Sequence, residues 1–125
     1  MPIMSLARPG LEVSIEHLGN GTIEVRDTEW FNVTVKNPFD YRVVDITLYV
    51  ELTKADGSKT TKNFLIPSNM SVNYINAGGS WVSSLQLRVG DDDGQHCLNA
   101  TVYYDVERVE SNASRGKLDL KITKD

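Results

Sequence analysis

The sequence predicts an all-β domain built from two packed antiparallel sheets with seven to eight short strands. Apolar residues recur at every second position, which places alternate side chains on opposite faces of a strand. Turn-forming residues interrupt this alternation at intervals of roughly 8–12 residues, the spacing typical of a β-sandwich. No stretch of ten or more residues carries a helical period.

Three strands are expected in the first third of the chain, over residues 11–16, 23–25 and 31–36. In the first of them Leu11, Val13 and Ile15 alternate with polar residues. A turn is expected after residue 36, because Pro38 cannot donate to a strand ladder and restricts the residue before it. Residues 1–10 are expected to be a flexible segment, and the sandwich to span 11–125.

The clearest strand covers residues 44–52, where the apolar side chains predicted to face the core are Val44, Ile46, Leu48, Val50 and Leu52. Gly57 can take the positive φ of a hairpin turn, so residues 60–66 are expected to return alongside this strand. Pro67 then ends the return strand.

Later strands are expected over residues 71–75, 81–89, 96–105 and 118–122, with a polar loop at 110–116. Trp81 is in phase with Leu85 and Leu87, which predicts that it packs centrally in the core. The complete pattern predicts a two-sheet antiparallel sandwich of the immunoglobulin type.

Composition excludes several classes of function. A chain of 125 residues is expected to form one domain. The net charge of −4 and scattered basic residues argue against nucleic-acid binding, which needs clustered Lys and Arg. No segment approaches the ~18 apolar residues of a membrane helix, so direct membrane insertion is not expected. The single Cys97 excludes an intrachain disulfide.

Five Asn-x-Ser/Thr sequons occur where nine Asn and 19 Ser or Thr, placed at random, would give roughly 1.4. Such sequons are glycan acceptors in exported proteins. The acceptor residues are Asn20, Asn32, Asn69, Asn99 and Asn112. Three of them, Asn20, Asn69 and Asn112, are expected in turns, and the other two on the polar face of strands. We therefore expect an extracellular or cell-surface glycoprotein whose export signal or anchor lies outside this sequence.

Catalytic chemistry is not expected. A nucleophile triad needs a His base beside a nucleophile, and neither His17 nor His96 lies in such a motif. Cys97 follows His96 directly, but neighbouring residues of a strand point to opposite faces.

Asp91, Asp92 and Asp93 raise the alternative of a Ca²⁺ site, because Ca²⁺ prefers six to eight oxygen ligands. The run lacks the alternate spacing and the final Glu of an EF-hand loop, so a solvated hairpin turn is favoured. No other cofactor is expected.

Three aromatic side chains are predicted to point outward from strands: Trp30, Tyr49 and Tyr103. Exposed Trp and Tyr are enriched at protein interfaces, and they can also stack on sugars. The alternative is cross-strand pairing on a solvated sheet.

Residues 31–37, Phe-Asn-Val-Thr-Val-Lys-Asn, resemble the second strand of CARDB-like domains, the adhesion-related immunoglobulin-like domains of archaeal and bacterial surface proteins. Residues 75–80 are similar to that family's Ala-Gly step before a strand, and residues 99–105 to its late strand. A second resemblance is to the soluble β-sandwich domains of archaellum adaptor (stator) proteins.

These resemblances imply adhesion or assembly rather than catalysis. The expected partner is a protein of the surface layer, of an appendage or of a neighbouring domain. Contact is expected through a sheet face or an edge strand, which also allows a homodimer. The alternative function is a carbohydrate- or Ca²⁺-binding module.

Overall fold

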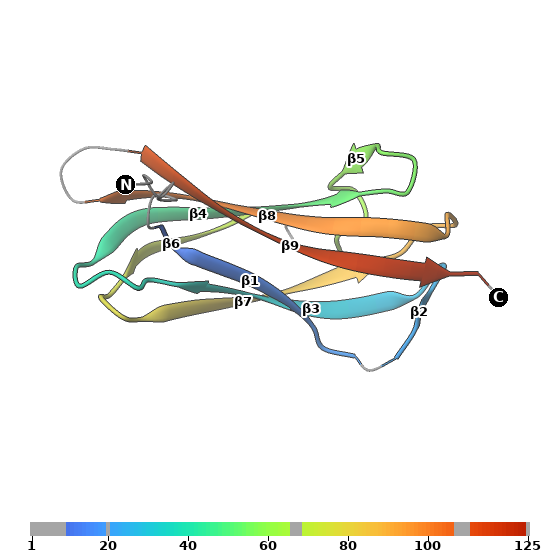
Figure 1. The fold of residues 1–125 in the computed structure, drawn as a ribbon, viewed down its shortest axis with the longest axis horizontal. Helices are drawn as coiled ribbons and strands as arrows, with labels where there is room; N and C mark the ends of the chain where they lie inside the picture. Colours follow the sequence, from blue (N-terminus) through green and yellow to red (C-terminus); the bar gives the residue numbers. More distant parts are fainter. Residues whose placement is uncertain (1–9, 20, 66–68, 107–110, 125) are drawn as a thin grey trace, which may run out of the picture.

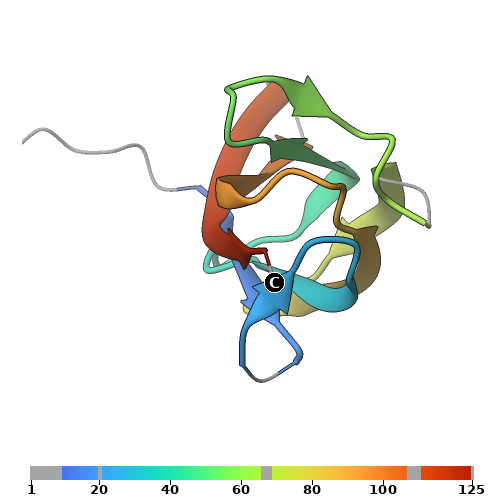
Figure 2. The same ribbon diagram turned by 90° about the vertical axis from the view of Figure 1, so that its right-hand side faces the viewer.

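The computed structural model describes residues 10–19, 21–65, 69–106 and 111–124. It confirms the predicted two-sheet sandwich, whose two layers are seen from the side in Figure 1 and from one end in Figure 2. The strands of these residues are β1 (Glu12–His17), β2 (Ile23–Glu24), β3 (Thr28–Lys36), β4 (Val43–Thr53), β5 (Lys59–Thr60), β6 (Asn69–Ile75), β7 (Ser80–Arg88), β8 (Gly94–Val106) and β9 (Ser111–Thr123). The predicted segment 1–10 lies outside the described residues except for Gly10.

One layer is a three-stranded sheet in the order β1-β3-β7. The other is a six-stranded sheet in which β2, β9, β8 and β4 follow one another, and both β5 and β6 pair with the far side of β4. All pairings are antiparallel except that of β2 with β9, where Ile23 lies opposite Ile122. Within the described residues, no helix is long and apolar enough to cross a membrane.

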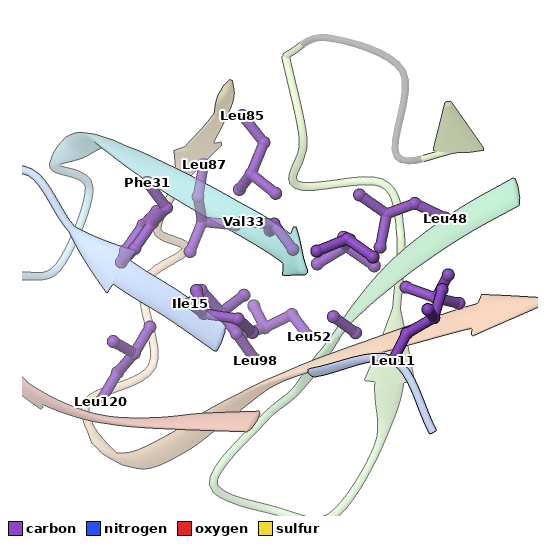
Figure 3. Close-up of a cluster of buried hydrophobic side chains, with 14 of the residues drawn as sticks. Leu11, Ile15, Phe31, Val33, Leu48, Leu52, Leu85, Leu87, Leu98 and Leu120 are labelled. Atoms are coloured by element: carbon purple, nitrogen blue, oxygen red, sulfur yellow. The ribbon is translucent and has the colours of Figure 1, made fainter. Parts of the chain in front are cut away.

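The core lies between the two layers, as Figure 3 shows. Its largest fully buried side chain is Phe31, and Leu48, Leu52 and Leu98 point into the same core from the opposite sheet. Trp81 was expected at the centre, but it is only partly buried and packs against the cluster from its margin. Among the described residues, the aromatic side chain that is fully buried in the core is therefore Phe31.

A β-bulge changes the phase of β4. The register shifts between Val44 and Thr47, and Asp45 has a φ of 52°, in the left-handed region. Val43 and Ile46 are consequently both buried, whereas Val44, which was predicted to face the core, is half-buried. Asp is one of the few residues that tolerate this backbone region, which accounts for the residue type at the bulge.

The predicted return strand over 60–66 is wrong for residues 61–65, and residue 66 lies outside the described residues. β5 ends at Thr60, and the chain then crosses to the other sheet, where Phe64 forms a bridge with Leu87. The Leu65 N–H donates to the Gln86 carbonyl at 2.9 Å. This segment therefore covers one end of the β7 edge.

The predicted loop over 110–116 is instead, from Ser111 onward, the first half of β9, and residue 110 lies outside the described residues. A Cβ on Gly116 would collide with the backbone carbonyl of Val13, because β1 lies against β9 at this point (Figure 1). A glycine permits this close approach of two backbones, which brings the two sheets together along one side of the sandwich.

Asn37 directly follows β3 and is fully buried. Its Nδ2 donates to the carbonyls of Tyr41 (2.9 Å), Ile75 (3.1 Å) and Asn76 (3.2 Å). Its Oδ1 accepts the backbone N–H of Phe39 at 2.9 Å. One amide thus fixes two turns, and this explains the Asn that closes the strand motif of residues 31–37.

Candidate interaction surfaces

Large apolar side chains form a row across the outer face of the three-stranded sheet. Leu18 follows β1 and donates its N–H to the Trp30 carbonyl at 3.0 Å. Trp30 lies opposite Gln86 on β7, and Leu65 lies beside Gln86 on the other side. Leu18, Trp30 and Leu65 are 47%, 45% and 52% exposed. We call these three residues, together with Gln86, the apolar row.

The outward direction of the row follows from its buried neighbours. His17, Phe31 and Phe64 each precede or follow a member of the row and point toward the core side. Because successive residues of an extended chain point to opposite faces, the row members point to solvent. Adjacent strands lie about 4.8 Å apart, so the row is a continuous feature of the surface.

The outward position of Trp30 was predicted, whereas Leu18 and Leu65 were missed. Leu18 lies just after β1, and Leu65 lies in the segment that was predicted to return alongside β4, so the sequence placed neither of them on this face. Backbone hydrogen bonds to Trp30 and Gln86 align them with the sheet, and the bridge between Phe64 and Leu87 also aligns Leu65.

The outer face of the six-stranded sheet carries the other two predicted aromatics. Tyr49 on β4 and Tyr103 on β8 are 47% and 45% exposed. Their rings meet edge to face, with centroids 5.6 Å apart. Together with Thr47 they line a shallow hollow. The predicted cross-strand pairing is therefore present, and both rings still leave about half of their surface to solvent.

The neighbourhood of this tyrosine pair is polar. Farther along the same face, another hollow is lined by Thr, Asn, Lys, Arg, Glu and Cys side chains; they are Glu51, Thr53, Lys59, Cys97, Asn99, Thr101, Arg115 and Lys117. Burial raises the pKa of the Cys97 thiol, and the carboxylate of Asp119, opposite it on β9, raises it further.

The sequon asparagines differ in their placement. Asn32 and Asn99 lie on outward faces, as predicted, between fully buried neighbours. Asn69 and Asn112 were expected in turns, but they lie in β6 and β9. The predicted acceptor Asn20 falls outside the described residues.

Asn112 also has the wrong phase for a surface acceptor. It lies opposite the buried Tyr104 and shares its side of β9 with Ser114, Leu120 and Ile122. Its placement resulted from long-range pairing that local turn signals did not reveal.

Asp91, Asp92 and Asp93 lie in the exposed turn between β7 and β8. The Arg26 Nε is 3.8 Å from Asp91 Oδ1, and both side chains are well exposed. Among the described residues, no three His, Cys, Asp or Glu side chains are grouped so as to hold a metal ion.

Both histidines have structural contacts. The His17 Nε2 lies 2.8 Å from Glu29 Oε1, and its ring packs on Phe31. His96 is buried, and its Nδ1 lies 3.1 Å from the Gly94 carbonyl oxygen. Neither contact joins a histidine to a nucleophile.

No protein-family model matches the sequence, and a search of curated proteins finds no match. Solved structures do match. The CARDB domain of the PF1109 protein from Pyrococcus furiosus, solved in complex with di-metal ions, has a TM-score of 0.65 and 20% identity, with 92% of this chain and 89% of that chain covered. An ASH/PapD-like domain of human CEP192 has a TM-score of 0.59 and 15% identity, with 100% of this chain and 95% of that chain covered.

Red sea bream transglutaminase matches with a TM-score of 0.62 and 17% identity over 96% of this chain, but over only 16% of that chain. The likeness therefore concerns a small part of that enzyme. At these identities the comparisons establish the fold: the chain has the immunoglobulin-like fold of the CARDB domain, which the strand motifs had indicated.

Proposed function

We propose that this domain is a non-enzymatic module of an exported, cell-surface protein, and that it binds a protein partner through the apolar row. The observation that carries this proposal is the alignment of Leu18, Trp30 and Leu65, each about half exposed, on one sheet face. Trp is enriched among the residues that dominate binding at protein interfaces. The five sequons support an extracellular location.

The partner is a surface-layer, appendage or neighbouring-domain protein. The edge strands offer a second route of contact, including a homodimer, because β6 pairs only with β4 and leaves one side without a strand partner among the described residues. An unpaired edge can accept a strand from another chain. The apolar row is favoured over the edge because it offers exposed apolar side chains, whereas the edge offers mainly unpaired backbone groups.

Site-specific photo-cross-linking tests this proposal. The photoreactive residue p-benzoylphenylalanine is placed at position 30 of the full-length protein, on the cells that make it, and at position 49 as a matched control on the opposite sheet. A discrete protein adduct is expected from position 30 and not from position 49.

Leu18→Ser and Leu65→Ser should each reduce the adduct from position 30. A fully buried Leu contributes about 1.5–3 kcal/mol, and 1.4 kcal/mol corresponds to tenfold in affinity. Each change should therefore weaken binding roughly tenfold or more. Equal adducts from both positions, or an adduct insensitive to both replacements, would overturn the proposal.

A further inference from the structure

Asn69 is the most accessible of the four sequon asparagines that the structure describes. It begins β6, an edge strand, and its side chain is exposed. Within the described part of the chain, its amide makes no hydrogen bond. The Ser71 of the same sequon is also exposed, so both recognition side chains of the tripeptide point outward.

The other described acceptors are engaged or turned inward. Asn32 lies in the central strand of its sheet, and its Oδ1 accepts a hydrogen bond from Ser84 Oγ at 2.7 Å. Asn99 lies between β4 and β9, and its Nδ2 donates to Thr53 Oγ1 at 3.0 Å. Asn112 has the inward phase described above. A glycan on Asn99 would compete with the Nδ2 hydrogen bond to Thr53, and one on Asn112 would displace packed side chains. A glycan on Asn32 would have to leave the sheet between the side chains of β1 and β7.

The tyrosine pair lies next to Asn69. Asn69 is directly opposite Tyr49, and Ser71 is directly opposite Thr47, which in turn lies opposite Tyr103. Directly opposite residues on one face have Cβ atoms about 4.5–5.5 Å apart, and diagonal neighbours about 7–8 Å. Both half-exposed rings are therefore within reach of the first sugars of a chain attached to Asn69.

Sugar rings and tyrosine rings fit together physically. The C–H face of a pyranose is apolar and packs on an aromatic face by dispersion and loss of hydrated surface. The tyrosine hydroxyls remain available to the sugar oxygens, whereas the Thr47 Oγ1 lies 3.4 Å from Ser71 Oγ. The exposed halves of Tyr49 and Tyr103 provide such a platform.

We propose that Asn69 carries an N-linked glycan whose first sugars lie over Tyr49 and Tyr103, so that the six-stranded face is covered by sugar of the same chain. The donor is a lipid-phosphate-activated oligosaccharide. A bond forms between Asn69 Nδ2 and sugar C1, the C1–O bond to phosphate breaks, Nδ2 loses one proton, and the lipid phosphate leaves. The inference rests on the export assumed in the proposed function.

The test begins with the exported protein from a glycosylating host. Peptide mass spectrometry is expected to find Asn69 occupied more fully than Asn32, Asn99 and Asn112. Melting temperature is then compared between the glycosylated protein and Asn69→Gln. Loss of the glycan should lower the melting temperature by roughly 2–5 °C, the shift that a modest stabilisation gives a domain of this size.

A second pair of variants separates stacking from other glycan effects. In a Tyr49→Ser background, the drop in melting temperature caused by Asn69→Gln should be less than about 1 °C. Tyr74→Ser is the matched control. Tyr74 is an exposed tyrosine of β6, the strand of Asn69, and it packs with Arg42 at the other end of that strand. In the Tyr74→Ser background, the full drop in melting temperature caused by Asn69→Gln should remain. Asn69→Gln made in a non-glycosylating host measures the substitution alone.

An unoccupied Asn69 in the exported protein would overturn the inference. An occupied Asn69 whose loss has the same effect in Tyr49→Ser as in the unmodified sequence would also overturn it. Neither result bears on the cross-linking at position 30, which tests partner binding without any glycan. Failure of this inference and failure of the proposed function are therefore distinguishable.

Discussion

The three-stranded sheet exposes leucine and tryptophan in one row, whereas the six-stranded sheet exposes two tyrosines among Thr, Asn and charged side chains. Both faces follow the same rule, since alternate residues of every strand point outward. The difference lies in what those outward residues can contact. Leu18, Trp30 and Leu65 favour a protein that removes apolar surface from water, while Tyr49 and Tyr103 keep polar handles that suit sugar.

The two aromatic sites also differ in how they are held. Trp30 lies on a sheet of three strands, and its row is completed by segments outside regular strands. The tyrosine pair lies on the two central strands of the larger sheet and is fixed by an edge-to-face contact. The apolar row is thus flanked by segments outside regular strands, whereas the tyrosine pair lies within two paired strands on the opposite side of the core.

The largest expected effect is on the free energy of unfolding, and it comes from a pair of substitutions on β3 that separates stability from binding. Phe31 and Trp30 are neighbours, but Phe31 is fully buried and Trp30 is 45% exposed. Phe31→Ala should lower the free energy of unfolding by about 3–5 kcal/mol. Trp30→Ala should lower it by less than about 1 kcal/mol, while abolishing partner binding.

Urea denaturation measures the two free energies of unfolding. Photo-cross-linking from another position of the apolar row measures partner binding by the Trp30→Ala protein. A Trp30→Ala protein that is as unstable as Phe31→Ala would mean that Trp30 serves the fold and not a partner.

A slightly smaller effect is expected from Asn37→Asp, which tests whether the turns between the faces depend on one amide. The change keeps the shape of the side chain but replaces the Nδ2 that donates to three carbonyls by an oxygen. Loss of these bonds, together with a buried carboxylate that faces carbonyl oxygens, should lower the free energy of unfolding by roughly 2–4 kcal/mol. Thermal unfolding measures it, with Asn73→Asp as an exposed control on β6.

The chemistry of the six-stranded face can be probed through Cys97, with a smaller effect. Burial, and then the Asp119 carboxylate, raise the pKa of its thiol, so the protonated form persists to higher pH than in a free cysteine. Alkylation requires the thiolate. At pH 8 alkylation should therefore be slow, should quicken as pH rises, and should be several-fold faster in Asp119→Asn because the pKa falls.

Lys117 acts in the opposite direction, since its charge lowers the pKa of Cys97. Lys117→Gln should accordingly slow alkylation. Equal rates in both variants and in the unmodified protein would show that the charges of this face do not act on Cys97.

Local alternation was enough to predict the sandwich and the outward positions of Trp30, Tyr49 and Tyr103, because each lies in a strand with clear apolar neighbours. It could not predict the bulge at Asp45, which depends on pairing with two other strands. It also missed the first half of β9, where Gly116 replaces an apolar residue because β1 lies against it. Strand register joins residues far apart in the sequence, and the apolar row and the Asn69–Tyr49 pair both depend on it.

The most direct test of the different coverage of the two faces is hydroxyl-radical footprinting of Trp30 and Tyr49 in one exported protein. We expect Trp30 oxidation to slow on the cell surface relative to the purified domain, whether or not Asn69 is glycosylated. We expect Tyr49 oxidation to be slow in both preparations and to rise only in Asn69→Gln. Two results would contradict the account. The oxidation rates of Trp30 and Tyr49 could change together, or neither rate could respond to the partner or to the glycan.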